Sequence, residues 1–174
     1  MQRPMHRLAC WLALTIAAAL PATAAELGQG DFELGLSALL QDTEASGFYL
    51  NLSTRVGYMI TRNHEAGPLV SLIYVNPDEG ESFTGASLGA FYRYNFGTTG
   101  KYNVPFLGLS ATGYTGGLAD QLEWSWQAES GVRIMPSPLV SINTVLFWHR
   151  DYPKVDWILS ERYFGVSIGV SLFL

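Results

Sequence analysis

The stretch ERYFGVSIGVSLFL, residues 161–174, keeps a two-residue rhythm up to the last position. One phase is apolar and consists of Phe164, Val166, Ile168, Val170, Leu172 and Leu174. A period of two is typical of a β-strand, whose side chains alternate between two faces. Because chain ends usually fray unless they are held, the pattern predicts a terminal strand that is paired along its length. One face of that strand must also rest against an apolar environment.

Seven other segments predict strands of similar length. In the ranges 32–41, 48–60, 86–96, 104–114, 122–134 and 139–149, one phase is mostly apolar and the other carries small or polar side chains. Segment 68–76 is apolar in both phases, so the sequence leaves its facing open. Eight strands of about ten residues match the length that crosses a bilayer when tilted.

The charged residues distinguish a membrane barrel from a soluble one. In the seven unambiguous segments the apolar phase has no charge through its central stretch. The opposite phase carries Glu33, Arg55, Arg93, Glu123, Glu129, Arg133 and Glu161. An outer face without charges would aggregate in water, whereas a charge at the bilayer midplane costs about 2–4 kcal/mol. We therefore predict an all-β fold, an eight-stranded antiparallel up-and-down transmembrane β-barrel whose last strand pairs with the first, since closure removes exposed edges.

The N-terminal residues 1–25 have the anatomy of a secretory signal peptide. Arg3 and Arg7 precede the apolar run LACWLALTIAAAL, and PATAA offers cleavage after Ala24 or Ala25. We expect this segment to be removed, which leaves residues 26–174 as the barrel domain of an exported protein. The chain is 14% charged with a net charge of −5, against about 25% charged residues in soluble domains. No basic patch of the kind that nucleic acid requires is present.

Aromatic residues gather towards the two ends of the predicted strands. With the mature N-terminus taken as periplasmic, they form an external and a periplasmic girdle, which mark the membrane interfaces. The external girdle consists of Trp124, Trp126 and Trp148, and the periplasmic girdle consists of Tyr58, Tyr94 and Phe96. Arg150 and Arg162 lie in the outward phase near the external end. They would either contact lipopolysaccharide phosphates or extend to the surface without a preferred lipid.

The chain resembles the small OmpA/OmpX-like outer-membrane β-barrel proteins of Gram-negative bacteria. The resembling stretches are RVGYMITRNHEAGPLVSL (55–72), ASLGAFYRYNF (86–96), VPFLGLSATGY (104–114) and QAESGVRIMPSPLVSI (127–142). The resemblance implies an outer-membrane location and contact with lipids and lipopolysaccharide. It also implies that the apolar phase of residues 164–174 is an assembly signal for the barrel-insertion machinery. That signal normally ends in an aromatic residue, and here Leu174 takes the place. We expect a monomer.

The predicted interior charges allow two interpretations. Side chains nearly fill the lumen of an eight-stranded barrel, and each buried charge needs a partner. We expect a charged network that fills the lumen of a structural, envelope-stabilising protein. The alternative is a narrow channel for ions or small solutes, gated by Arg55, Arg93, Glu123, Glu129 and Arg133.

A second alternative is a lipid A-modifying hydrolase that uses His149 and Glu161. The segment His149-Arg150-Asp151-Tyr152 looks superficially like the His-x-Ser-Asn motif of lipid A deacylases, but it lacks the serine. His149 also lies in the inward phase, away from the lipid. We expect no catalysis, no cofactor and no metal site.

Overall fold

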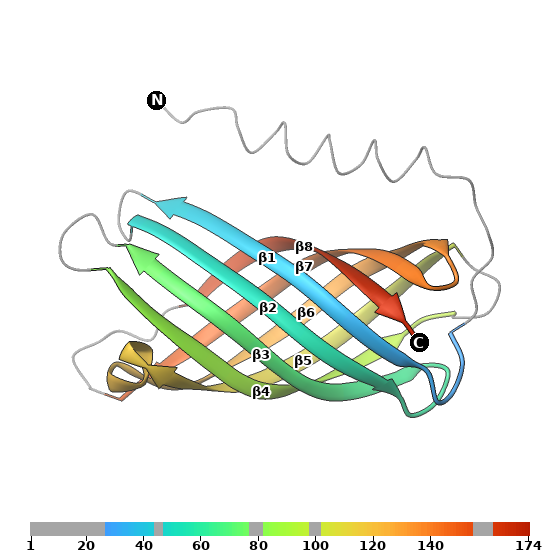
Figure 1. Cartoon of the computed structure of the whole chain (residues 1–174), viewed down its shortest axis with the longest axis horizontal. Helices are drawn as coiled ribbons and strands as arrows, with labels where there is room; N and C mark the ends of the chain where they lie inside the picture. Colours follow the sequence, from blue (N-terminus) through green and yellow to red (C-terminus); the bar gives the residue numbers. More distant parts are fainter. Residues whose placement is uncertain (1–26, 44–46, 77–81, 98–101, 155–161) are drawn as a thin grey trace.

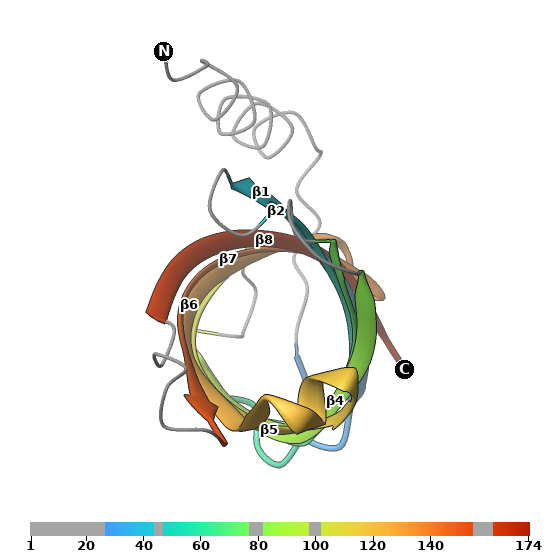
Figure 2. The same cartoon turned by 90° about the vertical axis from the view of Figure 1, so that its left-hand side faces the viewer.

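The computed structural model describes residues 27–43, 47–76, 82–97, 102–154 and 162–174. Within them, eight antiparallel strands form one closed barrel, in which each strand pairs with its neighbours in the chain (Figures 1 and 2). The strands are β1 (Phe32–Thr43), β2 (Gly47–Met59), β3 (His64–Asn76), β4 (Phe83–Asn95), β5 (Asn103–Gly116), β6 (Leu122–Ser137), β7 (Val140–Pro153) and β8 (Arg162–Phe173), with a short 3-10 helix, η1 (Gly117–Asp120), before β6. The predicted up-and-down barrel is confirmed.

The predicted signal peptide lies outside the described residues, as does Glu161. Among the described residues, no helix is long and apolar enough to cross a membrane. The C-terminal Leu174 lies at one end of the barrel, which we call the terminal end, and η1 lies at the other, the loop end (Figure 1).

The barrel closes where β8 meets β1. The backbone N–H of Leu174 donates to the Phe32 carbonyl oxygen at 2.9 Å, and the Phe32 N–H donates back at 3.1 Å. From there the register runs from Glu33–Phe173 to Ala38–Ile168. The predicted pairing of the last strand with the first is therefore confirmed, and it explains why the two-residue rhythm continues to the chain end.

The two phases of each strand take the faces that a membrane barrel requires. Outward leucines such as Leu36 and Leu88 are about 60% exposed, whereas the inward Glu33 and Arg93 are 1% exposed. The predicted assembly signal occupies the outward face of β8, where Phe164 is 84% exposed; its role in assembly stays a prediction.

Strand β3 settles the facing that the sequence left open, and it begins earlier than predicted. Its buried side chains include Leu69, Ser71 and Ile73, and the alternate ones face outward. The strand starts at His64 instead of Pro68, because the turn before it is tight: the Ile60 N–H donates to the His64 carbonyl oxygen at 2.8 Å.

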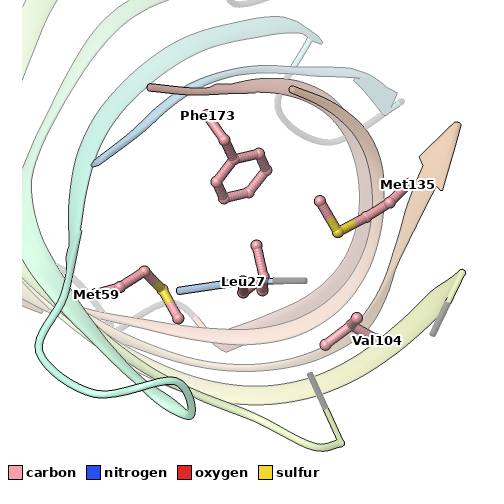
Figure 3. Packing of buried hydrophobic residues seen from close by; sticks show 5 residues of the cluster. All are labelled: Leu27, Met59, Val104, Met135 and Phe173. Atoms are coloured by element: carbon pink, nitrogen blue, oxygen red, sulfur yellow. The ribbon is translucent and has the colours of Figure 1, made fainter. Parts of the chain in front are cut away.

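Leu27, from the segment before β1, closes the terminal end of the lumen together with four side chains of the barrel wall. Figure 3 shows Leu27 in the middle of a ring of inward-pointing side chains. This apolar plug consists of Leu27, Met59, Val104, Met135 and Phe173, each at most 4% exposed. The segment is held by a hydrogen bond from the Gly30 N–H to the Met59 carbonyl oxygen at 2.9 Å. Gly30 has a φ of 95°, a conformation that favours glycine.

Candidate functional site

Six charged side chains in the lumen form a chain of alternating sign, which we call the lumen network. Their order is Arg55, Glu129, Arg93, Glu33, Arg133 and Glu65. Along this order the nitrogen–oxygen distances between neighbours are 3.2, 2.7, 3.8, 2.5 and 3.2 Å. Three arginines face three glutamates, so the network balances its own charge.

Uncharged side chains supply the hydrogen bonds that a buried ion pair needs to offset its desolvation. Ser171 of β8 donates to Glu33 Oε1. On the β7 side, Asn143 Nδ2 donates to Ser171 at 2.7 Å, and the Arg133 Nε donates to Asn143 Oδ1 at 3.3 Å. These polar contacts therefore follow the inner wall over four consecutive strands of the closed barrel, β1, β8, β7 and β6.

Phenylalanine rings cover the guanidinium groups. The Arg93 Cζ lies 4.0 Å from the Phe106 ring centroid, and the Arg133 Cζ lies 4.9 Å from that of Phe173. A cation over an aromatic face is stabilised further when it is desolvated. The Phe173 ring also belongs to the apolar plug, so the plug and the network are in direct contact.

Glycines give the charged side chains room. A Cβ at Gly108 would lie 2.8 Å from Glu129 Oε1 and 3.0 Å from the Tyr92 carbonyl oxygen. Because real Cβ atoms essentially never come within 3.0 Å of another residue, a side chain here would displace Glu129. Small residues in the inward phase therefore serve the packing of the network.

The half of the lumen towards the loop end holds a cavity of about 60 Å³. Hydroxyl side chains dominate its wall: Ser37, Ser53, Ser71, Ser87, Ser110, Thr112, Ser125 and Ser167. Arg55 also borders it, with the rest of the network beyond. A cavity of this volume takes about four water molecules.

His149 faces this cavity. Its Nε2 lies 3.0 Å from Asp151 Oδ1, and Asp151 also accepts a hydrogen bond from the Tyr114 hydroxyl. Its Nδ1 lies 3.4 Å from Gln127 Oε1. Both ring nitrogens thus have protein partners in the lumen, an arrangement that fits a rim histidine held by its neighbours.

The predicted girdle residues lie on the outward face, in two groups. At the loop end, ring centroids are 4.2 Å apart for Trp124 and Tyr152 and 4.6 Å apart for Trp126 and Trp148. At the terminal end, the corresponding pairs are Phe32–Tyr58 at 5.1 Å and Tyr94–Phe96 at 4.8 Å.

Arg150 and Arg162 are register partners on β7 and β8. Like charges placed directly opposite each other are destabilising. The Arg150 Cζ lies 4.8 Å from the Tyr152 ring centroid, and the Arg150 Nε is buried without a hydrogen-bond partner.

The structure brings five of the seven predicted interior charges together. Glu161 lies outside the described residues. Glu123 is exposed and apart from the network, because the β6–β7 register shifts between Leu122 and Trp124 and leaves it at an irregularity. Glu65 was missed because residues 61–67 read as a turn. Among the described residues, no group of three or more potential metal ligands is present.

No protein-family model and no curated protein matches this chain. Among solved structures it is similar to the N-terminal β-barrel domain of Pseudomonas aeruginosa OprF, with 14% identity and a TM-score of 0.57 over 84% of this chain and 99% of that one. It is also similar to Neisserial surface protein A, NspA, with 16% identity and a TM-score of 0.57 over 82% of this chain and 94% of that one. A third similar structure is the outer membrane protein OprG from Pseudomonas aeruginosa, with 12% identity and a TM-score of 0.56 over 86% of this chain and 98% of that one. At these identities the likeness is one of fold. The predicted resemblance to small outer-membrane barrels is confirmed at that level, and none of these descriptions names a hydrolytic activity.

Proposed function

We propose that the protein is a monomeric outer-membrane barrel with a structural, envelope-stabilising role and a lumen that does not conduct. The observation that carries the proposal is the closure of the lumen by two layers in series, the lumen network and the apolar plug. An ion would have to separate the guanidinium–carboxylate pairs and then cross a desolvated cluster that includes Leu27. Each step is costly, because buried charges need partners and apolar groups give an ion none.

The terminal end would face the periplasm and the loop end the outside. The outward aromatic pairs near both ends of the barrel support a bilayer between them, since such girdles lie at the interfaces. Insertion would depend on the barrel-insertion machinery, with the outward phase of β8 as its signal.

Conductance in planar bilayers tests the closed lumen. We expect the purified, folded protein to give no discrete current steps. Regular single-channel steps from protein that is verified as folded would contradict the filled barrel and support a narrow channel.

The mass spectrum of lipid A from matched cells with and without the protein tests the absence of catalysis. We expect an unchanged spectrum, because His149 faces the lumen and both its ring nitrogens have protein partners. Loss of one acyl chain in cells that carry the protein would identify a hydrolase instead.

Arg150 and Arg162 would hold a phosphate of lipopolysaccharide. A shared anion would offset the repulsion between two opposed guanidinium groups and satisfy the Arg150 Nε. Replacing both with glutamine should lower the lipopolysaccharide that copurifies with the barrel. An unchanged amount would leave them as ordinary interfacial arginines.

A further inference from the structure

The seam between β1 and β8 is paired only in its terminal half. Within the described residues, the register stops at Ala38–Ile168, although β1 continues to Thr43 and β8 begins at Arg162. Continuing it would pair Leu40 with Val166. Figure 2 looks into the barrel from the loop end and shows the tip of β1 standing apart from the wall that β8 continues, and Figure 1 agrees.

The cavity reaches this seam. Its wall includes Leu39 on the β1 side and Ser167 on the β8 side. It also includes Ala38, which belongs to the outward phase of β1. Ala38 and Ile168 form the last pair of the β1–β8 ladder, and Leu39 and Ser167 would form the next pair if the register continued. The cavity therefore borders the place where strand pairing between β1 and β8 stops.

The unpaired edges require polar partners. In a bilayer, lipid-exposed backbone groups without hydrogen bonds cost several kcal/mol each, and irregular backbone is tolerated only beside protein or a water-filled cavity. Here the edges border the hydroxyl-rich wall, so water or a polar group in the cavity can satisfy them.

The surroundings of the seam are amphipathic. Leu39 and Tyr163, from the two sides of the seam, pack against the buried cluster of Phe106, Val145 and Phe147. The inner edge of the opening, which we call the apolar lip, therefore consists of apolar side chains. Behind the lip are the serine and threonine hydroxyls. The two basic side chains on the cavity wall are already engaged, Arg55 by Glu129 and His149 by Asp151. The site therefore offers hydroxyl partners and no unpaired cation for an anionic group.

We propose that the loop-end half of the β1–β8 seam is a lateral entrance, through which the cavity takes the uncharged, glycerol-sized head of a single-chain lipid from the outer leaflet. The head binds the serine and threonine hydroxyls, and the acyl chain passes the apolar lip and stays on the barrel surface. The cavity volume sets the size of the head, because room for about four water molecules excludes a larger sugar. This inference rests on the proposed location in a bilayer.

Disulfide trapping tests the opening. The chain has no other cysteine once residues 1–25 are removed, because Cys10 is the only one. Leu36→Cys with Val170→Cys joins two outward register partners in the paired half. Leu40→Cys with Val166→Cys forms the second pair, four residues from the first on each strand in the direction of the loop end. If the β1–β8 ladder continued, the two cysteines of this pair would face each other as those of the first pair do. On oxidation we expect the first pair to cross-link and the second to remain reduced. Equal cross-linking of both pairs would overturn the lateral entrance, whether or not the barrel conducts.

Native mass spectrometry of the folded protein with 1-monooleoylglycerol tests the occupant. We expect a one-to-one adduct with monooleoylglycerol and at least tenfold weaker binding of oleate. Ser167→Phe fills the cavity, so it should lower the affinity for monooleoylglycerol at least tenfold. Leu88→Phe, on the outward face of β4 and away from the seam, should bind normally. Ser110→Leu provides a second cavity-filling variant if Ser167→Phe does not fold. Absence of the adduct, equal binding of oleate, or binding that survives both cavity-filling variants would overturn the proposal.

Discussion

Arg93 occupies the centre of the lumen network, where it joins Glu129 to Glu33. Arg93→Ala would leave both carboxylates short of a cation, and removing one partner of a buried ion pair costs about 3–5 kcal/mol. We expect a correspondingly lower free energy of unfolding by urea in lipid vesicles. Lys154→Ala, at an exposed position, should leave the stability unchanged. If Arg93→Ala instead opened large single-channel currents at unchanged stability, the network would be a gate and not a structural element.

Gly108 and Gly113 on β5 form a matched pair for testing how tightly the network is packed. A Cβ at Gly108 would meet Glu129 at 2.8 Å, whereas at Gly113 the nearest atom is 3.9 Å away. Forcing extra atoms into a packed interior costs about 1–3 kcal/mol. We expect Gly108→Ala to lower the urea midpoint by that amount and Gly113→Ala to leave it unchanged or slightly raised. Similar effects of the two substitutions would mean that the lumen adapts to added volume.

At the residue scale, alternation predicts which face a side chain takes but neither its depth nor its partner. Phase alone placed Arg55, Arg93 and Arg133 inside. Glu123 lies in the same phase but is exposed beside the register shift at the start of β6, so phase alone does not predict burial near a strand end. Glu65 was hidden by the polar residues around it, which resemble a longer turn. Neither error could be corrected without knowing where pairing begins.

At the scale of the element, β3 carries a prediction about its outward face. Leu72 near the middle of the strand and Leu139 in the β6–β7 turn at the terminal end are 62% and 63% exposed. An arginine near the bilayer midplane costs about 2–4 kcal/mol, and one near the interface about 0–1 kcal/mol. We therefore expect Leu72→Arg to destabilise the barrel in vesicles far more than Leu139→Arg. Equal costs would mean that the two positions do not differ in membrane depth.

The segment before β1 and the seam were beyond sequence reasoning for different reasons. Leu27 enters the lumen from a stretch with no periodicity, so nothing in the sequence marks it as a core residue. The seam lies between two strands whose alternation continues unbroken in Leu40 and Val166. The alternation of side chains predicts the conformation of a single strand. Hydrogen bonding between β1 and β8 depends also on the distance between the two strands, which the sequence pattern does not give.

At the scale of the whole molecule, the fold depends on closure of the barrel. The hydrogen-bonded ladder between β1 and β8 in the terminal half of their seam closes it. The unboiled protein should migrate differently from the boiled protein on a gel, because a closed barrel resists detergent until it is heated. Removing residues 170–174 would delete the β8 partners of Phe32, Glu33, Leu34, Gly35 and Leu36, and leave only Ser37–Gly169 and Ala38–Ile168 of the β1–β8 ladder. Since the loop-end half is already unpaired, the chain has no other register with which to close. We expect the truncated chain to lose the mobility difference. A shift that survived the truncation would locate closure elsewhere in the barrel.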